Sequence, residues 1–294
     1  MSATSCVAPA QLPSSGRTGS RRAHPPPHRS PRSLRACHPP VTRMQLSPSE
    51  GGASSLAVQV GRPADRRRTL SRAEARQVYD KHGAKDQVRD SESVYGGPAT
   101  EALLAAADLE AARLVFEFGH GSGRLAARLL RQHLPPDCRY IGVDQSEVMH
   151  GLAAQRLAPF GERATLRLSH DGDPCAGGDG LPDGCADVFL STYVLDLLDD
   201  GDTDAVLALA ARLLRPGGQL CLTGLTYGSR VGPLQAAMTW VWELVHAVLP
   251  RTVGGCRAQN LEDYLGPLWE LRSRSLVSGG LITSEVIVCR KRAD

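Results

Sequence analysis

After residue 113, short apolar runs alternate with helix-like segments through most of the chain. The runs have the length of buried strands and cover residues 114–116, 140–143, 164–168, 187–193 and 219–225. The segments between them are long enough to form helices. Because a helix must carry the chain back before each new parallel strand, this alternation predicts an α/β, Rossmann-like fold with a doubly wound, mostly parallel sheet.

The final segments break the alternation. Residues 268–277 and 282–289 both have strand-like patterns, and Gly279 and Gly280 join them with no helix between. We therefore expect an antiparallel C-terminal hairpin at one end of the sheet, which brings the sheet to seven strands.

Several helix starts are marked by capping residues. Ser71 and Glu74 form a capping-box pattern that opens a helix over residues 72–81, and a Gly-Gly-Pro break precedes an Ala/Leu-rich helix over residues 99–109. Further along the chain, Ser146 and Asp202 are expected to cap the helices that follow them.

A strongly apolar helix is predicted between the fifth strand and the hairpin, in residues 231–250. Trp240 and Leu244 lie one turn apart on its apolar face. The favoured interpretation is a helix buried on the sheet. The alternative is that Trp242 and His246 join Tyr227 in the wall of an apolar or aromatic acceptor pocket.

Composition divides the chain into an N-terminal tail, residues 1–68, and a domain, residues 69–294. The tail holds 11 of the 34 basic residues, two of the 31 acidic residues, ten of the 20 prolines and no aromatic residue. Such a segment is expected to be disordered, because it cannot bury enough apolar surface to offset its ordering entropy. The domain has 23 basic and 29 acidic residues, a formal charge of −6, which argues against a nucleic-acid partner.

The tail is poor in acids and rich in Ser and Arg, and so resembles a transit peptide for the chloroplast or mitochondrion. The tail could instead be an extension without a targeting role on a cytoplasmic protein, or translation could start at Met44.

No apolar run reaches the ~18 residues that cross a bilayer, so no membrane span is expected. The eight cysteines lack metal-ligand spacing, so no metal site is expected; the oligomeric state stays open.

The stretch LVFEFGHGSGR, residues 114–124, predicts a strand, a glycine turn and a helix. Gly119 and Gly121 leave room for a bulky ligand to approach the backbone, and Gly123 lets the following helix pack tightly on the strand. Arg124 stands where a dinucleotide fingerprint has its third glycine. Glu117 adds a carboxylate that can hold the amino end of a zwitterionic ligand.

Asp144 closes the second strand, 21 residues after Gly123. A βαβ unit places a carboxylate about 20 residues beyond the glycine turn, beside the ribose of a bound nucleotide. A carboxylate can accept hydrogen bonds from both the 2′ and the 3′ hydroxyl. The two acids and the glycine turn therefore predict a ligand that contains ribose.

These residues resemble motif I of class I S-adenosylmethionine (SAM) methyltransferases, E/D-x-G-x-G-x-G. His120 departs from the small or Cys residue common at its position, where only the backbone needs to fit. The L-R-P-G-G turn at residues 214–218 and the Tyr79-Asp80 pair are similar to features of the same family, most of all its type 11 and quinone-biosynthesis-like group. The resemblance implies SAM as the cofactor. The cofactor-binding residues that it implies are Glu117, Gly119, Gly121, Gly123, Asp144, Asp171 at the adenine amino group, and Ser191.

The resemblance also implies methyl transfer to a small-molecule acceptor. The fourth strand exits as Ser-Thr-Tyr-Val, unlike the motifs that grip exocyclic amino nitrogens, so a nucleobase acceptor is not expected. His170, His246 and Tyr193 are candidates for a general base, and no catalytic residue is assigned. Two alternatives stay open: a nicotinamide-dependent reductase, disfavoured by Arg124 and the terminal hairpin, and a non-catalytic methyltransferase-like binding protein.

Overall fold

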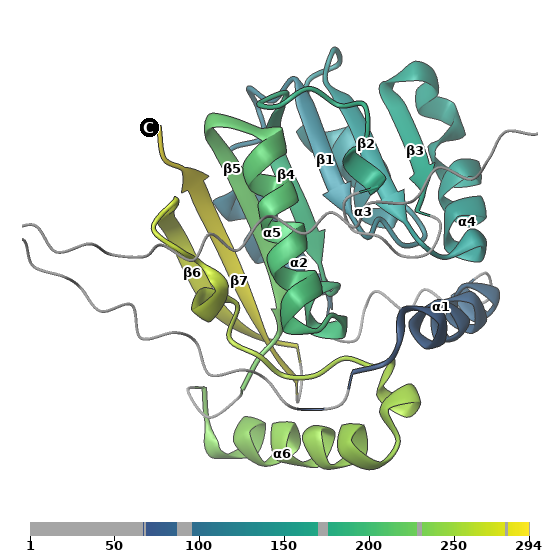
Figure 1. Cartoon of the computed structure of the whole chain (residues 1–294), viewed down its shortest axis with the longest axis vertical. Coiled ribbons are helices and arrows are strands. Elements are labelled where there is room, and N and C mark those ends of the chain that lie inside the picture. Colours follow the sequence, from purple (N-terminus) through teal and green to yellow (C-terminus); the bar gives the residue numbers. More distant parts are fainter. Residues whose placement is uncertain are drawn as a thin grey trace, which may run out of the picture. The chain divides into compact units, whose positions relative to one another are not determined.

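Seven strands form one mixed sheet in the computed structural model, in the order β3-β2-β1-β4-β5-β7-β6 (Figure 1). In chain order the strands are β1 (Leu114–Phe118), β2 (Arg139–Asp144), β3 (Ala164–Leu168), β4 (Ala186–Thr192), β5 (Leu214–Leu225), β6 (Trp269–Gly279) and β7 (Ile282–Lys291). The first five are parallel, and β7 runs antiparallel to both β5 and β6. The predicted doubly wound sheet and its terminal hairpin are confirmed.

The structure describes residues 67, 69–86, 96–169, 176–227, 231–279 and 282–293. These residues all belong to one compact unit that spans Gln59–Asp294. Apart from Arg67, the predicted tail lies outside the described residues. Arg67 itself forms an ion pair with Glu243, with 2.5 Å between Nη1 and Oε2.

Six helices connect and cover the strands in the described part of the chain. They are α1 (Arg72–Asp86), α2 (Gly96–Ala106), α3 (Arg124–Arg128), α4 (Glu147–Leu157), α5 (Asp200–Leu213) and α6 (Pro233–Val248). A π-helical turn continues α3 over Leu129–His133, and short 3-10 turns occupy Ala158–Arg163, Ala176–Gly178, Leu195–Leu197, Pro250–Val253 and Leu261–Tyr264.

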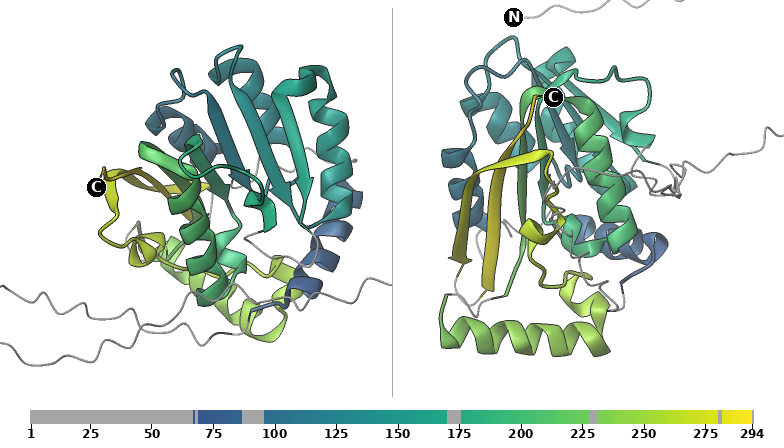
Figure 2. Two further views of the ribbon diagram at one scale, coloured as in Figure 1. Left: turned by 45° about the horizontal axis from the view of Figure 1, so that its top comes forward. Right: turned by 60° about the vertical axis from the view of Figure 1, so that its left-hand side comes forward.

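The central strand β1 buries both of its faces. Val115 belongs to an apolar cluster with residues of α2, α3 and the start of the π-helical turn. Its neighbour Phe116 points to the other side, into a cluster with α5, and stacks on Phe189 of β4 with the ring centroids 5.2 Å apart. The domain is therefore a three-layer α/β/α sandwich, as Figures 1 and 2 show.

Capping residues mark the helix starts, with one difference from expectation. Ser71 and Glu74 form the predicted capping box: the Ser71 amide donates to Glu74 Oε2 at 3.0 Å, and the Glu74 amide donates to Ser71 Oγ at 3.3 Å. Ser146 caps α4 as predicted. The prediction for Asp202 is wrong, because Asp199 caps α5 by accepting from the Asp202 amide at 2.8 Å. The Asp202 carboxylate instead pairs with Arg72 of α1 at 2.5 Å.

The predicted burial of the apolar helix on the sheet is also wrong. Figures 1 and 2 show α6 beyond the carboxyl ends of β4 and β5, away from both faces of the sheet. Trp240 is 67% exposed and Leu244 is 51% exposed. The faces of the sheet are already covered by other helices, and α6 packs instead on the turn Pro250–Val253 and on part of β7.

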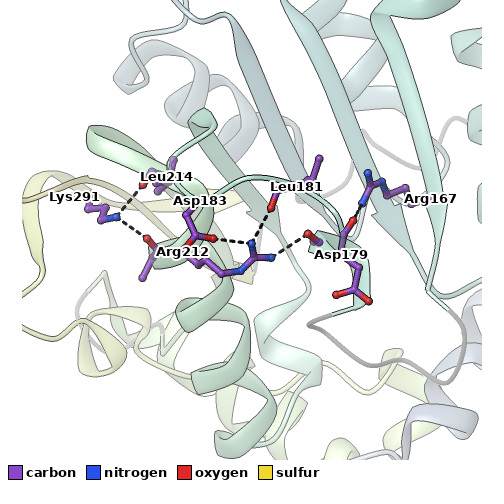
Figure 3. Close-up of polar contacts among 9 residues, drawn as sticks. Arg167, Asp179, Leu181, Asp183, Arg212, Leu214 and Lys291 are labelled. Carbon is purple, nitrogen blue, oxygen red and sulfur yellow. Dashed lines mark hydrogen bonds and ion pairs between the residues drawn. The ribbon is translucent and has the colours of Figure 1, made fainter. Parts of the chain in front are cut away.

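Basic side chains bind residues 179–183, which precede β4 (Figure 3). Arg212 of α5 donates to the Leu181 carbonyl and to Asp183, both at 3.0 Å, and Arg167 donates to the Asp179 carbonyl at 2.8 Å.

Lys291 of β7 donates to the Leu214 carbonyl at 2.9 Å, beyond the C-terminal end of α5. Cations suit this end of a helix, where carbonyls lack intrahelical partners.

Candidate functional site

A cavity of about 710 Å³ opens at the carboxyl ends of the parallel strands. Its walls come from the glycine turn after β1, the end of β2, the exit of β4, α1 and the loop around Cys256. Carboxyl ends of parallel strands are the usual ligand-binding edge of an open α/β sheet. Four predicted cofactor residues line this cavity: Glu117, Gly119, Gly121 and Asp144.

The glycine turn requires glycine at each of its three positions, for different reasons. All three have positive φ angles: 81° at Gly119, 52° at Gly121 and 74° at Gly123. A Cβ on Gly119 would lie 2.2 Å from a methyl carbon of Val194, whereas a Cβ on Gly121 would meet nothing within 4 Å. Gly121 therefore leaves open space for a ligand, and Gly119 makes room for the exit of β4.

The close approach at Gly123 is to a helix rather than to the strand that we expected. A Cβ there would lie 3.0 Å from the backbone Cα of Ala153, in α4. Gly123 is not among the residues that line the cavity. In this structure it determines how closely α3 and α4 pack.

Asp144 holds the glycine turn through its carboxylate. Oδ2 accepts from the Gly121 amide at 2.8 Å, and Oδ1 accepts from the Ser146 amide at 2.9 Å. The Ser146 hydroxyl in turn donates to Asp80 of α1 at 2.6 Å. Asp144 is half-buried, so its carboxylate combines backbone support with access to the cavity, which suits the predicted ribose contact.

Glu117 is a buried acid in the cavity wall, with 1% of its surface exposed. The hydroxyl of Tyr140 donates a hydrogen bond to its Oε2. Burial raises the pKa of the Glu117 carboxyl to about 7; the hydrogen bond from Tyr140 opposes this shift and the nearby charge of Asp144 adds to it. The carboxyl can thus gain or lose a proton near neutral pH.

This raised pKa predicts a pH-dependent stability. The folded protein keeps a proton on Glu117 that the unfolded chain releases near the ordinary pKa of 4.5, so the free energy of unfolding falls as the pH rises from about 4.5 to about 7. We expect the replacement Glu117→Gln to remove this contribution, which amounts to about 3 kcal/mol at most. Urea unfolding of the wild type and of Glu117→Gln at pH 5 and pH 8 measures this contribution. If the free energies of unfolding of the two proteins differed by the same amount at both pH values, the prediction would be contradicted.

The imidazole of His120 is part of the buried wall, a role for the side chain that the sequence did not predict. It is 4% exposed, and its Nδ1 lies 2.7 Å from the Gly121 carbonyl. Burial lowers the pKa of His120, against the opposing effect of Asp144, so the neutral ring is favoured. Nδ1 then carries the proton and donates to the carbonyl, which leaves Nε2 as an acceptor.

Ser191 does not line the cavity. Ser191 is buried, and its hydroxyl donates to the Phe118 carbonyl at 3.1 Å, which ties β4 to β1. Asp171 and the candidate base His170 lie outside the described residues. Their predicted roles stay predictions.

Residues from distant segments complete the cavity, and several carried no local sequence signal. Met149 of α4 follows a predicted helix cap, and it lines the cavity. Leu70, Leu197, Leu198 and Cys256 come from segments without a recognisable motif. Tyr79 of α1, part of the Tyr-Asp pair, lies beside them with its hydroxyl 3.9 Å from the Cys256 sulfur.

The alternative interpretation of the apolar helix, an acceptor wall formed by Trp242, His246 and Tyr227, is not met in this cavity. Trp242 donates through Nε1 to the Cys256 carbonyl at 2.8 Å, and His246 Nε2 lies 3.2 Å from the Gly255 carbonyl. Neither side chain lines the cavity, and neither does Tyr227. Of the described candidates for a general base, Tyr193 does line it, with a strained backbone φ of 55° at the exit of β4.

Within the described ranges, no three His, Cys, Asp or Glu side chains gather in a way that could hold a metal ion. None of the helices described is both long and apolar enough to span a membrane. The five described cysteines are free thiols, as expected from their scattered spacing: Cys138, Cys185, Cys221, Cys256 and Cys289.

Comparison with known proteins identifies the domain. Residues 115–218 match the family model described as a methyltransferase domain. An uncharacterized methyltransferase of Geobacillus thermodenitrificans is 32% identical over 144 residues, which are 48% of this chain and 59% of that relative. The chain thus matches about three fifths of the relative's length.

Solved structures share the fold at low sequence identity. The N-methyltransferase NodS from Bradyrhizobium japonicum, in complex with S-adenosyl-L-homocysteine (SAH), aligns with a TM-score of 0.54 and 15% identity, over 75% of this chain and all of NodS. The [4+2]-cyclase SpnF aligns with a TM-score of 0.55 and 16% identity, over 78% of this chain and all of SpnF. In the sequence of residues 115–218 and in its fold, the chain is thus similar to class I SAM-dependent methyltransferases.

Proposed function

We propose that this protein transfers a methyl group from SAM to a small, apolar or aromatic acceptor molecule. The observation that carries the proposal is that the lining of one cavity combines polar and apolar groups. Glu117, the glycine turn and Asp144 supply polar groups. Leu70, Tyr79, Leu197, Leu198 and Cys256 supply apolar and aromatic surface in the same cavity.

The polar residues of the cavity fit the parts of SAM. Asp144 offers acceptor oxygens for the ribose hydroxyls, and Glu117 offers a carboxylate for the ammonium group of the methionine end. The space beside the backbone of Gly121 is open, because a Cβ there would meet no atom within 4 Å, so the ligand can approach the backbone at this position. Asp171, which lies outside the described residues, is proposed to accept from the adenine amino group. The proposed contribution of Ser191 to cofactor binding acts through its hydrogen bond to the Phe118 carbonyl, next to the glycine turn.

SAM, when bound, supplies the methyl group and its own leaving group. The contribution of the protein is to hold acceptor and methyl in line and to exclude water, and such positioning can lower a barrier by about 7–11 kcal/mol. Helix α1 forms part of the cavity wall, where Arg72 pairs with Asp202 of α5 and both residues line the cavity. No side chain is assigned as a general base.

The test is calorimetric titration of the full chain with SAH and, separately, with NAD. We expect micromolar binding of SAH and none of NAD. Binding of NAD alone would support the reductase alternative. Incubation with SAM that carries a labelled methyl group and with a cell extract then follows, with the products separated by polarity. Label in apolar products is expected; SAH binding without any transfer would favour the non-catalytic alternative.

A further inference from the structure

A buried contact joins the cavity wall to the interior of the sheet. Tyr140, on β2, is fully buried, and its hydroxyl donates to Oε2 of Glu117, on β1. In the parallel register of these strands, Glu117 lies opposite Gly142 and Val115 lies opposite Tyr140. The tyrosine therefore reaches along its own strand, past Gly142, to meet an acid two positions further on.

Glycine at position 142 makes this reach possible. A Cβ there would lie 2.7 Å from the Tyr140 hydroxyl oxygen and 3.0 Å from Cδ2 of His120. Contacts under 3.0 Å require a shift of one of the groups, so a side chain at this position would displace the hydroxyl from Glu117. The φ angle of Gly142 is not in the positive range, so the need for glycine here is steric.

The hydrogen bond occupies one oxygen of the acid. Among the described residues, no side chain engages the other oxygen, Oε1, while Glu117 lines the cavity. Burial raises the pKa of Tyr140 well above its ordinary value, and the neighbouring Glu117 adds to the shift. Tyr140 therefore stays neutral at physiological pH and acts as a donor to Glu117.

We propose that Tyr140 is a positioning residue for cofactor binding: it holds Oε2 of Glu117 so that Oε1 is presented to the ammonium group of the ligand. This inference rests on the proposed function, because it takes the ligand to be SAM or its product SAH. Binding of the ammonium group favours the ionised carboxylate, so a Glu117 that is protonated in the empty cavity releases its proton when the ligand binds.

Other ionisable groups line the cavity together with Glu117, and among them the charge of Asp144 raises the pKa of Glu117. They come from every element that packs around it: Asp144 of β2, His120 of the glycine turn, Arg124 of α3, Arg72, Glu74 and Tyr79 of α1, Asp199 and Asp202 at the start of α5, Tyr193 after β4, and Cys256. Two ligands that differ only at the amino-acid end separate the effect of Glu117 on the pH dependence of affinity from the effects of the other ionisable groups. SAH carries that end, and 5′-methylthioadenosine shares its adenosine and thioether but lacks the ammonium and carboxylate groups.

The experiment compares the wild-type chain with Tyr140→Phe, by calorimetry with both ligands between pH 6 and pH 7.5. In the wild type, affinity for SAH should rise with pH across this range, and affinity for 5′-methylthioadenosine should not follow the same curve. Tyr140→Phe should lower the affinity for SAH about tenfold. It should leave the affinity for 5′-methylthioadenosine within about twofold of the wild type. Because the hydrogen bond that this variant lacks lowers the pKa of Glu117 in the wild type, the rise in SAH affinity should also move to higher pH in the variant.

If Tyr140→Phe lowered the affinity for both ligands equally, the role of Tyr140 would be merely structural and the proposal would be overturned. Unchanged affinity for both ligands would overturn it as well. Glu117→Gln provides a second measurement that does not depend on the folding of Tyr140→Phe. It should remove the part of the pH dependence that is specific to SAH, and an unchanged pH dependence would also overturn the proposal. If the wild type binds neither ligand, the proposed function fails, an outcome distinct from a failure of Tyr140→Phe alone.

Discussion

Replacement of Asp144 by Ala is expected to weaken SAH binding by about 100-fold or more, measured by calorimetry on the full chain. Hydrogen bonds to a charged carboxylate contribute about 1.5–3 kcal/mol each, and the two ribose hydroxyls would lose such partners together. The variant also leaves the amides of Gly121 and Ser146 without the acceptor they have in the wild type. We therefore expect a loss of stability of about 1–3 kcal/mol as well.

Two further variants separate the binding effect from the stability effect. Asp144→Asn keeps an oxygen that can accept from a backbone amide, so it should recover much of the stability but little of the SAH affinity. Asp183→Ala removes an acid that is 78% exposed and paired with Arg212, outside the cavity lining. It should bind SAH within about twofold of the wild type. Wild-type affinity in Asp144→Ala would remove Asp144 from the ribose site.

Gly119→Ala is expected mainly to lower stability, whereas Gly121→Ala is expected mainly to abolish ligand binding, although the two glycines are two positions apart in one turn. The first substitution drives a methyl group to 2.2 Å from Val194 at a φ of 81°, so it should cost about 2–5 kcal/mol of stability from overpacking and left-handed backbone strain. The second meets no atom within 4 Å. It should cost about 1–2 kcal/mol and abolish SAH binding, because its methyl group occupies open cavity space.

Thermal or urea unfolding and SAH calorimetry on both variants check this contrast. The double variant Gly119→Ala with Val194→Ala supplies a matched control, since removal of the Val194 methyl groups should restore part of the stability that Gly119→Ala loses. Equal stability losses for the two glycine variants, or normal SAH affinity in Gly121→Ala, would contradict the assignment of these roles.

The fold by itself does not determine the reaction. The structures that align with this chain at TM-scores of 0.54 and 0.55 include an N-methyltransferase and a [4+2]-cyclase. Both are below 20% identity, so they bear on architecture alone. For this reason the proposed methyl transfer depends on the residues of the cavity and on the labelled-methyl experiment.

The sequence by itself determined the sheet and the edge at which the cavity lies. Alternation of strand and helix patterns is local information, and the right-handed crossover rule converts it into a topology. The glycine turn and Asp144 were predictable for the same reason, because each follows directly after a strand. Their placement at one cavity needed only the parallel arrangement of β1 and β2.

Only the tertiary structure decided which surfaces meet across the chain. The hydrogen bond from Tyr140 to Glu117 depends on strand register and on the missing Cβ of Gly142, neither of which a periodic pattern shows. The exposure of Trp240 on α6 depends on which helices had already covered the sheet. Cys256 reaches the cavity through packing against α1. Local patterns determine which elements form, whereas contacts between distant elements arise from steric fit in the assembled fold.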